Sequence, residues 1–289
     1  MITIIEKLYP PILAESWDSI GLTVGDPQQT IKKVLLAVDP VSTVVSEAIK
    51  TKADLILTHH PLFLKPVHSV AANTNKGHVV HQLARHNIAL YNAHTNADSA
   101  PRGVAEALAH TIGLKNLKPL VPNPTRDEGT NNHGIGRVGD LPQPMSLAEF
   151  AQMVVDSLPP TAQPARVAGD LDAKVRRIAV VGGAGDSLFD AVRTHDVDVY
   201  VTADLRHHPA SEERERAHFA SLGWPNAAQT PFLVDVSHFA SEWPWLNYAA
   251  ADLAEACQEE GYQVEFEVST RNTDPWTAIV GPNGPIKLN

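Results

Sequence analysis

The sequence contains a single cysteine, Cys257, among 289 residues. One cysteine cannot form a disulfide within the chain, and it excludes a metal cluster built from several thiolates. We expect Cys257 to be a buried or half-buried small apolar residue. No run of 18 apolar residues occurs, so no transmembrane helix is predicted. Residues 1–6 lack the basic and then apolar segments of a secretory signal, and a cytoplasmic, reducing compartment is expected.

The sequence also has fewer basic than acidic residues. The chain has 23 Lys and Arg against 33 Asp and Glu, a formal net charge of -10. Non-specific nucleic-acid binding requires clustered cations, so nucleic acid is not an expected partner. An acidic protein can still bind an anionic substrate if metal ions supply local positive charge. With 43% hydrophobic and 19% charged residues, the composition favours a packed core.

Histidine, in contrast, is abundant. The chain has 14 His, and two pairs are adjacent: His59-His60 and His207-His208. Imidazole is the commonest protein ligand of transition metals, so metal binding is one explanation of this number.

The sequence also matches itself at an offset of 144 residues. One offset that holds through several separated segments without a gap indicates an internal duplication, with copies at roughly 1–120 and 145–262. The matched pairs include Gly25 and Gly169, Asp54 and Asp198, Thr58 and Thr202, His94 and His238, and Asp98 and Glu242.

Each copy alternates short β-branched runs with helical patterns, which predicts an α/β fold. We expect two similar α/β domains with mixed sheets flanked by helices, and a metal site in the cleft between them. The domains are predicted at 1–127 and 128–289, with a linker at 121–132 that is rich in Pro, Asn, Asp and Gly. A Ser with a Glu three residues later is a capping box, and it predicts a helix over residues 146–158. The tail after Ser269 contains three prolines and is expected to be irregular.

Polar motifs follow three of the predicted strands. His59 and His60 end one, residues 94–98 follow another, and residues 238–242 follow a third. Ligands of open α/β sheets bind where the carboxyl ends of strands converge, so these motifs are expected to share a cleft. Imidazole and carboxylate ligands suit zinc, iron or manganese, and a carboxylate can bridge two cations about 3.5–4 Å apart. His94 and Asp98 are four residues apart, as are His238 and Glu242. In each pair one residue could instead orient the other without itself binding a metal.

Other readings compete at several positions. A lone His at a strand end is more often a hydrogen-bonded loop residue than a ligand. The second copy has Asp204 where the first has His60, so we interpret His207 and His208 as substrate-side or structural. The glycine-rich run at 182–185 resembles a phosphate-binding turn, but tight packing is the favoured explanation.

Together these motifs resemble the dinuclear-metal-centre proteins called GTP cyclohydrolase 1 type 2 homologues, or NIF-three-like proteins. The matching segments are Trp17-Asp18-Ser19-Ile20-Gly21-Leu22, Thr58-His59-His60-Pro61-Leu62, His94-Thr95-Asn96-Ala97-Asp98, Gly182-Gly183-Ala184-Gly185-Asp186-Ser187, Val201-Thr202-Ala203-Asp204, His238-Phe239-Ala240-Ser241-Glu242 and Thr273-Asp274-Pro275.

The resemblance implies a two-domain α/β subunit that assembles into a toroidal homohexamer, with two divalent transition-metal ions (zinc, iron or manganese) per subunit. It maps the ligands to His59, His60, Asp98, His238 and Glu242, the last as the bridging carboxylate. His94 is then a near-site residue. Some members carry an inserted domain, which the gapless offset excludes here. Ser237 and Ala203 stand where the family usually has glycine.

Three functions are compatible with this resemblance. The first is a metal-dependent hydrolase in which activated water attacks a nucleotide-like substrate, as in a GTP cyclohydrolase, with His94 as a proton shuttle. Lys65, Arg102 or Arg206 would hold phosphates. A nucleotide phosphoesterase would use the same residues. The third is a metal-binding regulatory or scaffold hexamer without efficient catalysis.

Overall fold

The computed structural model describes residues 1–123, 132–223, 229–282 and 284–287, in two compact units. The first unit comprises residues 1–103 and 246–273, and the second comprises residues 104–245 and 274–289. The domain boundary predicted at residue 127, and most of the predicted linker, lie outside the described residues. Among the described residues, no helix is both long and apolar enough to cross a membrane.

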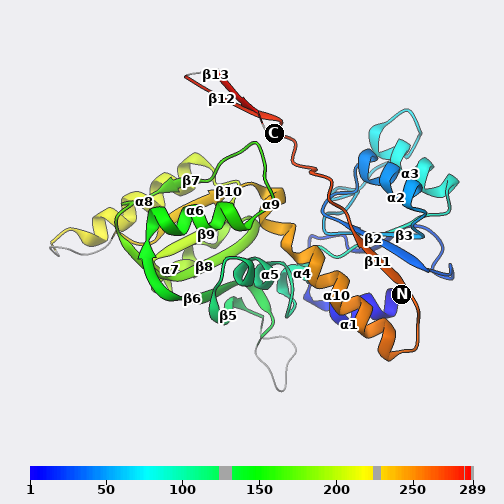
Figure 1. Ribbon diagram of the computed structural model, residues 1–289, viewed down its shortest axis with the longest axis horizontal. Helices are drawn as coiled ribbons and strands as arrows, with labels where there is room; N and C mark the ends of the chain where they lie inside the picture. The colour runs from blue at the N-terminus through cyan, green and yellow to red at the C-terminus, as the bar shows by residue number, and fades with distance from the viewer. Residues whose placement is uncertain (124–131, 224–228, 283, 288–289) are drawn as a thin grey trace. The chain divides into compact units, whose positions relative to one another are not determined.

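The first unit is built on a five-stranded sheet with the order β1-β4-β3-β2-β11. Strands β2, β3 and β11 of this sheet are labelled in Figure 1. Its strands are β1 (Gly21–Val24), β2 (Lys33–Ala37), β3 (Leu55–Thr58), β4 (Ala89–Asn92) and β11 (Glu265–Val268). Its helices are α1 (Ile2–Leu8), η1 (Pro11–Leu13), α2 (Ser42–Thr51), α3 (Asn75–Arg85), α4 (Thr95–Ser99) and most of α10 (Pro244–Glu259). Strands β11, β2, β3 and β4 are parallel, and β1 is antiparallel to β4.

The second unit is built on a six-stranded sheet with the order β5-β6-β8-β9-β10-β7. Its strands are β5 (Lys115–Pro122), β6 (Gly134–Ser146), β7 (Arg166–Ala168), β8 (Lys174–Ala184), β9 (Val199–Ala203) and β10 (Phe232–Val236). Its helices are α5 (Val104–Thr111), α6 (Leu147–Ser157), η2 (Asp186–Leu188), α7 (Phe189–Arg193), α8 (His207–Ser221) and α9 (His238–Glu242). Both sheets are mixed and flanked by helices, which confirms the predicted α/β class.

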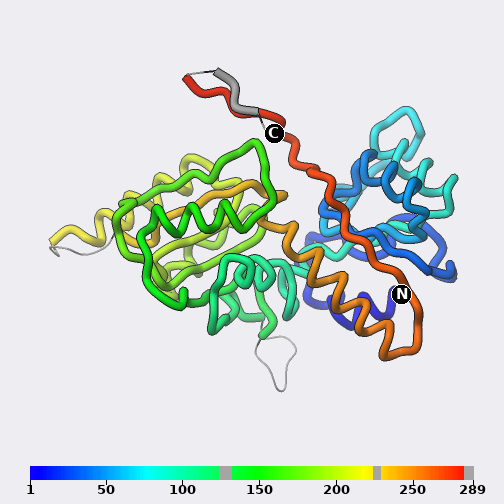
Figure 2. Tube along the Cα trace, viewed as in Figure 1, coloured from blue at the N-terminus to red at the C-terminus, as the bar shows by residue number. Residues whose placement is uncertain are grey.

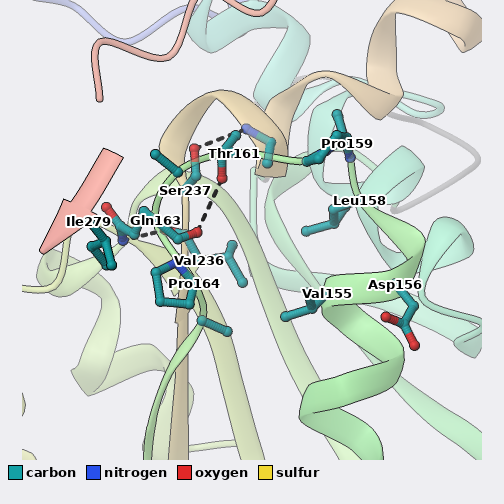
Figure 3. A pocket seen from close by; sticks show the side chains of 14 residues that line it. Val155, Asp156, Leu158, Pro159, Thr161, Gln163, Pro164, Val236, Ser237 and Ile279 are labelled. Carbon is teal, nitrogen blue, oxygen red and sulfur yellow. Dashed lines mark hydrogen bonds between the residues drawn. The ribbon is translucent and has the colours of Figure 1, made fainter. Parts of the chain in front are cut away.

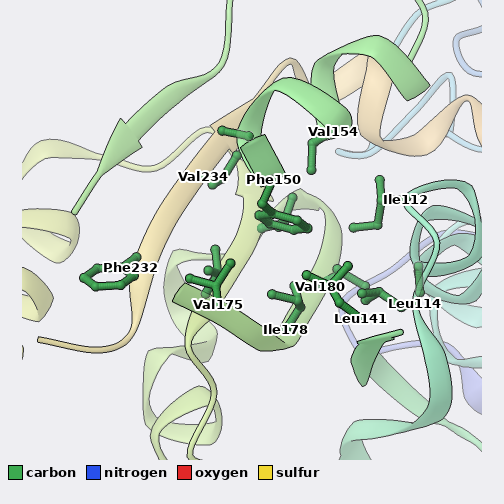
Figure 4. Close-up of a cluster of buried hydrophobic side chains, with 14 of the residues drawn as sticks. Ile112, Leu114, Leu141, Phe150, Val154, Val175, Ile178, Val180, Phe232 and Val234 are labelled. Atoms are coloured by element: carbon green, nitrogen blue, oxygen red, sulfur yellow. The ribbon is translucent and has the colours of Figure 1, made fainter. Parts of the chain in front are cut away.

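Alternating side chains on the strands of the second unit point into two cores, because successive residues of a strand face opposite sides of the sheet. Ile178 and Val180 pack with α5 and α6 in one cluster, around the fully buried Phe150 (Figure 4). Ala179 and Val181 pack on the other face with α7. Burying both faces explains why these strands are nearly continuous apolar runs.

Equivalent hydrogen bonds occur in the two sheets at positions 144 residues apart. The Asp54 carboxylate accepts from the backbone N–H groups of residues 32–33, and the Asp198 carboxylate accepts from those of residues 176–177. The predicted duplication requires such equivalence and remains our inference. In the neighbouring strand pair the register differs by one residue, because Leu55 pairs with Ala89 but Val199 pairs with Phe232.

The C-terminal tail, which we expected to be irregular, is irregular only in its first part. Residues 269–277 contain no helix or strand and trace an extended path (Figure 2). Beyond them β12 (Ala278–Gly281) and β13 (Gly284–Lys287) pair as an antiparallel hairpin. The prolines at 282 and 285 do not prevent this, because a two-stranded ribbon leaves half of its backbone N–H groups outside the ladder.

The predicted capping box is present at α6, and it generates a stability prediction. Ser146 accepts a hydrogen bond from the Glu149 N–H, and the Glu149 carboxylate accepts from the Ser146 N–H. Ser146→Ala should lower the free energy of unfolding by about 1 kcal/mol. Ser157→Ala at the other end of the same helix is the matched control, because its hydroxyl only donates back to the Met153 carbonyl. Urea unfolding followed by circular dichroism measures both, and equal losses would contradict a specific capping role.

Candidate metal centre

Three histidines of the first unit gather at the carboxyl ends of two adjacent strands. His59 and His60 follow β3, and His94 follows β4, which is parallel to β3. One ligand nitrogen from each of the three lies within 4.8 Å of the others. The ring centroids are 5.1–5.7 Å apart, and His59 is only 1% exposed. The parallel pairing of β3 and β4 therefore builds a cluster of imidazoles that could bind a cation.

The Nδ1 atom of each of these histidines faces an oxygen. For His59 this oxygen is the Ala93 carbonyl at 3.0 Å, for His60 it is Asp39 Oδ1 at 2.7 Å, and for His94 it is Asp18 Oδ1 at 2.9 Å. A neutral imidazole that donates from Nδ1 carries its basic lone pair on Nε2. Metal-ligating histidines are held in this way, with the second nitrogen bonded to a carboxylate or carbonyl.

Asp18 is held as an anion inside the protein. Its side chain is fully buried and accepts hydrogen bonds from His94 Nδ1 and from the Thr95 N–H and hydroxyl. Burial alone would raise the pKa of Asp18, but the bonds from His94 and Thr95 outweigh it and hold that pKa well below its usual range. The ionised carboxylate fixes both the ring of His94 and the start of α4.

Asp98 joins the same cluster from α4. Its Oδ1 lies 3.7 Å from His59 Nε2, beyond a hydrogen bond but within reach of a shared cation. Helix α4 begins at Thr95, soon after β4 ends at Asn92. Gly103 follows this helix at a place where a Cβ would lie 1.9 Å from the Ala97 carbonyl oxygen, so a glycine is needed there. The first unit thus brings together His59, His60, His94 and Asp98.

The second unit presents His238 and Glu242 from α9, directly after β10. His238 Nε2 lies 3.0 Å from Glu242 Oε1, and its Nδ1 lies 2.7 Å from Asp204 Oδ2. Burial lowers the pKa of His238, but the two carboxylates raise it by more, to about 11. A cation that binds Nε2 therefore has to displace a proton from this ring. The Glu242 carboxylate that faces His238 Nε2 is buried, with Glu242 only 3% exposed.

The glycine-rich run of the second unit packs against these two residues. Gly183 has φ +68°, and a Cβ there would lie 2.5 Å from Glu242 Oε1 and 3.1 Å from His238 Nε2. Its N–H donates to Ser241 Oγ, and its carbonyl accepts from Thr202 Oγ1. The glycine lets the sheet backbone approach the carboxylate, which favours the packing interpretation over a phosphate-binding turn.

Sequence reasoning assigned no orienting role to the three carboxylates that face histidines, namely Asp18, Asp39 and Asp204, although Asp18 and Asp204 stand in the segments that carry the family resemblance. Asp39 lies just beyond the end of β2, so the strand-end rule that found the histidines could also have found it. Asp18 precedes His94 by 76 residues, and no local pattern connects them. Ser237, one of the departures from the family pattern, is the N-cap of α9 and donates to the Asp274 carboxylate.

The cations predicted to hold phosphates have different surroundings. Arg102 donates three hydrogen bonds to Asp252 and lies over the Tyr248 ring, so its guanidinium is engaged in packing. Lys65 is exposed. Arg206 pairs with Asp186 through an exposed side chain and lines a hollow at the start of α8, together with His207.

A second hollow, of about 550 Å³, lies beside the strand end that carries His238 (Figure 3). The loop of residues 158–165 forms one wall, and Val236, Ser237 and Ala240 form another. Its lining is mainly apolar, and its size falls in the range of small-molecule sites. The hollow offers apolar surface next to a candidate ligand.

Comparison with known proteins identifies relatives over nearly the whole chain. A "GTP cyclohydrolase 1 type 2 homolog" of Streptomyces coelicolor is 48% identical over 280 residues, covering 97% of this chain and 93% of the relative. One of Mycobacterium tuberculosis is 34% identical over 378 aligned positions, covering 96% and 95%. That alignment is longer than this chain, so the mycobacterial relative contains residues that this chain lacks.

Solved structures share the fold. A hypothetical protein of Staphylococcus aureus superposes with a TM-score of 0.84 at 29% identity, covering 96% of this chain and 97% of that one. A Bacillus cereus protein related to NIF3 has a TM-score of 0.82 at 25% identity, covering 95% and 97%. The family model described as Duf34/NIF3 (NGG1p interacting factor 3) matches residues 1–275. The chain therefore belongs to the Duf34/NIF3 family.

Proposed function

We propose that this protein is a dinuclear metal-dependent hydrolase that acts on a nucleotide-like substrate. Its ligands are His59, His60, Asp98, His238 and Glu242, which bind two divalent transition-metal ions per subunit. The observation that carries the proposal is the imidazole cluster of the first unit, in which every Nδ1 is held by an oxygen. The expected homohexamer is part of the same proposal.

The donor set fits zinc, iron or manganese. All five ligands offer nitrogen or oxygen, and the lone cysteine is buried in α10. A structural zinc site would normally contain thiolates, whereas histidine and carboxylate ligands are typical of catalytic sites. Two such ions would lower the pKa of a bound water and polarise the substrate oxygen that the water attacks.

The side chains of this chain supply positioning and proton transfer. Asp18 keeps a proton on His94 Nδ1, so His94 Nε2 can accept a proton from the attacking water and return it to the leaving group. Glu242, held against Gly183, fixes a negative charge at a set distance from His238. The apolar hollow beside Ser237 is a place for a ring of the substrate from which water is excluded.

The ligand assignment predicts the metal content. Glu242→Gln should reduce the metal bound per chain from about two ions to fewer than one, because a neutral amide is a much weaker ligand of a divalent cation than a carboxylate. Glu213→Gln is the matched control, since Glu213 is equally buried at 3% exposure but pairs with Arg193 on another helix. Plasma mass spectrometry of the purified proteins, with circular dichroism to verify folding, measures the difference. The assignment is wrong if both Glu242→Gln and His59→Ala retain the wild-type metal content.

The orienting role of Asp39 predicts a weaker metal site when its charge is removed. Asp39→Asn should reduce zinc affinity about 10- to 100-fold, because His60 loses the carboxylate that fixes its tautomer. Asp156→Asn is the control, since Asp156 is exposed and accepts a hydrogen bond from Gln152 within the same helix, α6. Competition with a chromophoric chelator measures both affinities, and equal values for the two variants would remove Asp39 from the site.

Product analysis tests the reaction itself. Metal-loaded protein incubated with GTP should release formate if it opens the purine ring, and inorganic phosphate or nucleoside monophosphate if it is a phosphoesterase. His94→Gln should lower turnover about 10²- to 10⁴-fold at unchanged metal content. A parallel loss of metal would make His94 a ligand instead of a proton shuttle. Full metal occupancy with no turnover of GTP or other nucleotides would contradict the hydrolase and favour the scaffold alternative.

A further inference from the structure

A hollow of about 320 Å³ lies in the second unit where α8 begins, beside the edge strand β7. Its walls come from β7, the turn after β9, the first turns of α8, and β10. The lining residues are Arg166, Val167, Ala168, Leu205, Arg206, His207, Ala210, Ser211, Arg214, Leu233 and Asp235.

Basic side chains outnumber acidic ones in the lining of this hollow. Of its three guanidinium groups, Arg206 also pairs with Asp186, and Arg214 donates to the carbonyls of Gln229 and Pro231. The one carboxylate in the lining is that of Asp235. That carboxylate already accepts hydrogen bonds from Arg166 and from the Leu205 N–H. In a chain with a formal charge of -10, such a concentration of cations has a specific chemical preference for an anion.

The N-terminus of α8 also favours the binding of an anion in this hollow. Helix α8 has 15 residues; its third, Pro209, has no N–H, and the Ala210 N–H donates to the Arg206 carbonyl, so its N-terminal donors are the N–H groups of His207 and His208. His207, Ala210 and Ser211 of the first turns line the hollow. The first N–H groups of a helix carry partial positive charge and bind phosphate oxygens. Guanidinium groups bind the same oxygens in pairs.

The hollow adjoins the part of the centre that contains His238. Asp204, which holds His238 Nδ1, directly precedes the lining residues 205–207. Asp235 lies three residues before His238 on β10. A ligand in the hollow therefore lies next to the two strand ends that present the candidate ligand and its orienting carboxylate.

We propose that this hollow is the phosphate subsite of the enzyme, which makes its substrate a phosphorylated small molecule. The proposal rests on the proposed function, since it places the phosphate beside the metal centre that acts on the rest of the molecule. Arg206 and Arg166 bind the phosphate oxygens, and the start of α8 supplies backbone donors. The apolar floor of Leu205 and Leu233 limits the site to a small group.

A pair of charge reversals on one helix tests this. Arg206→Glu should weaken the binding of GTP and of tripolyphosphate to the metal-loaded protein by about tenfold or more, and leave guanosine binding and metal content unchanged. Arg216→Glu is the matched control. Arg216 is similarly exposed on α8, 62% against 76%, and also pairs with a carboxylate, but it does not line the hollow. Titration calorimetry measures each affinity.

Equal losses in the two variants, or no loss in either, would overturn the subsite. If inorganic phosphate binds the wild type as tightly as GTP and with the same dependence on Arg206, the ligand is free phosphate and the substrate assignment is wrong. If the Arg206 dependence holds but no phosphorylated compound is turned over, the subsite stands and the hydrolase fails. If GTP is turned over with an unchanged KM in Arg206→Glu, the hydrolase stands and the subsite fails.

Discussion

The candidate centre depends on hydrogen bonds to the Nδ1 atoms of its histidines. An imidazole can bind a cation through either nitrogen, and an untethered ring would rotate between them. In this protein His60, His94 and His238 each face a carboxylate at 2.7–2.9 Å through Nδ1, and His59 faces a carbonyl. These contacts fix the orientation of each ring before any ion binds, and in the first unit they also favour the proton on Nδ1, which reduces the entropy lost on binding.

The oxygens that hold these rings belong to the framework of the sheets. Ala93 directly follows β4, Asp39 follows β2, and Asp204 follows β9 in the left-handed region with φ +54°. Parallel strands place such positions at one edge, so regular pairing alone aligns the ligands with the groups that orient them.

The parts of the fold that depend on local pattern were predictable from sequence. Strand ends at His59, His94 and His238 follow from apolar runs that stop at polar residues, and the capping box of α6 is encoded within four residues. The tail hairpin was missed because its prolines have the composition of a loop.

Contacts between distant segments of the chain could not be predicted from local sequence patterns. Asp18 meets His94 only after β1 has paired with β4. The cationic hollow brings Arg166 and Arg214 together across 48 residues of sequence, through the pairing of β7 with β10. Neither residue belongs to a motif, so only the folded sheet identifies them as neighbours.

The path of the chain through the first sheet has a consequence for synthesis on the ribosome. Strand β11 completes that sheet beside β2, and Lys33 bridges Glu265 and Glu267 across the pair. The residues of β11 are translated after the whole of the second unit up to Trp245. Until they emerge, β2 is an open edge that exposes unpaired backbone groups, the kind of surface through which nascent chains associate. The first sheet thus stays incomplete while the second unit up to Trp245 is being made, until β11 has been translated.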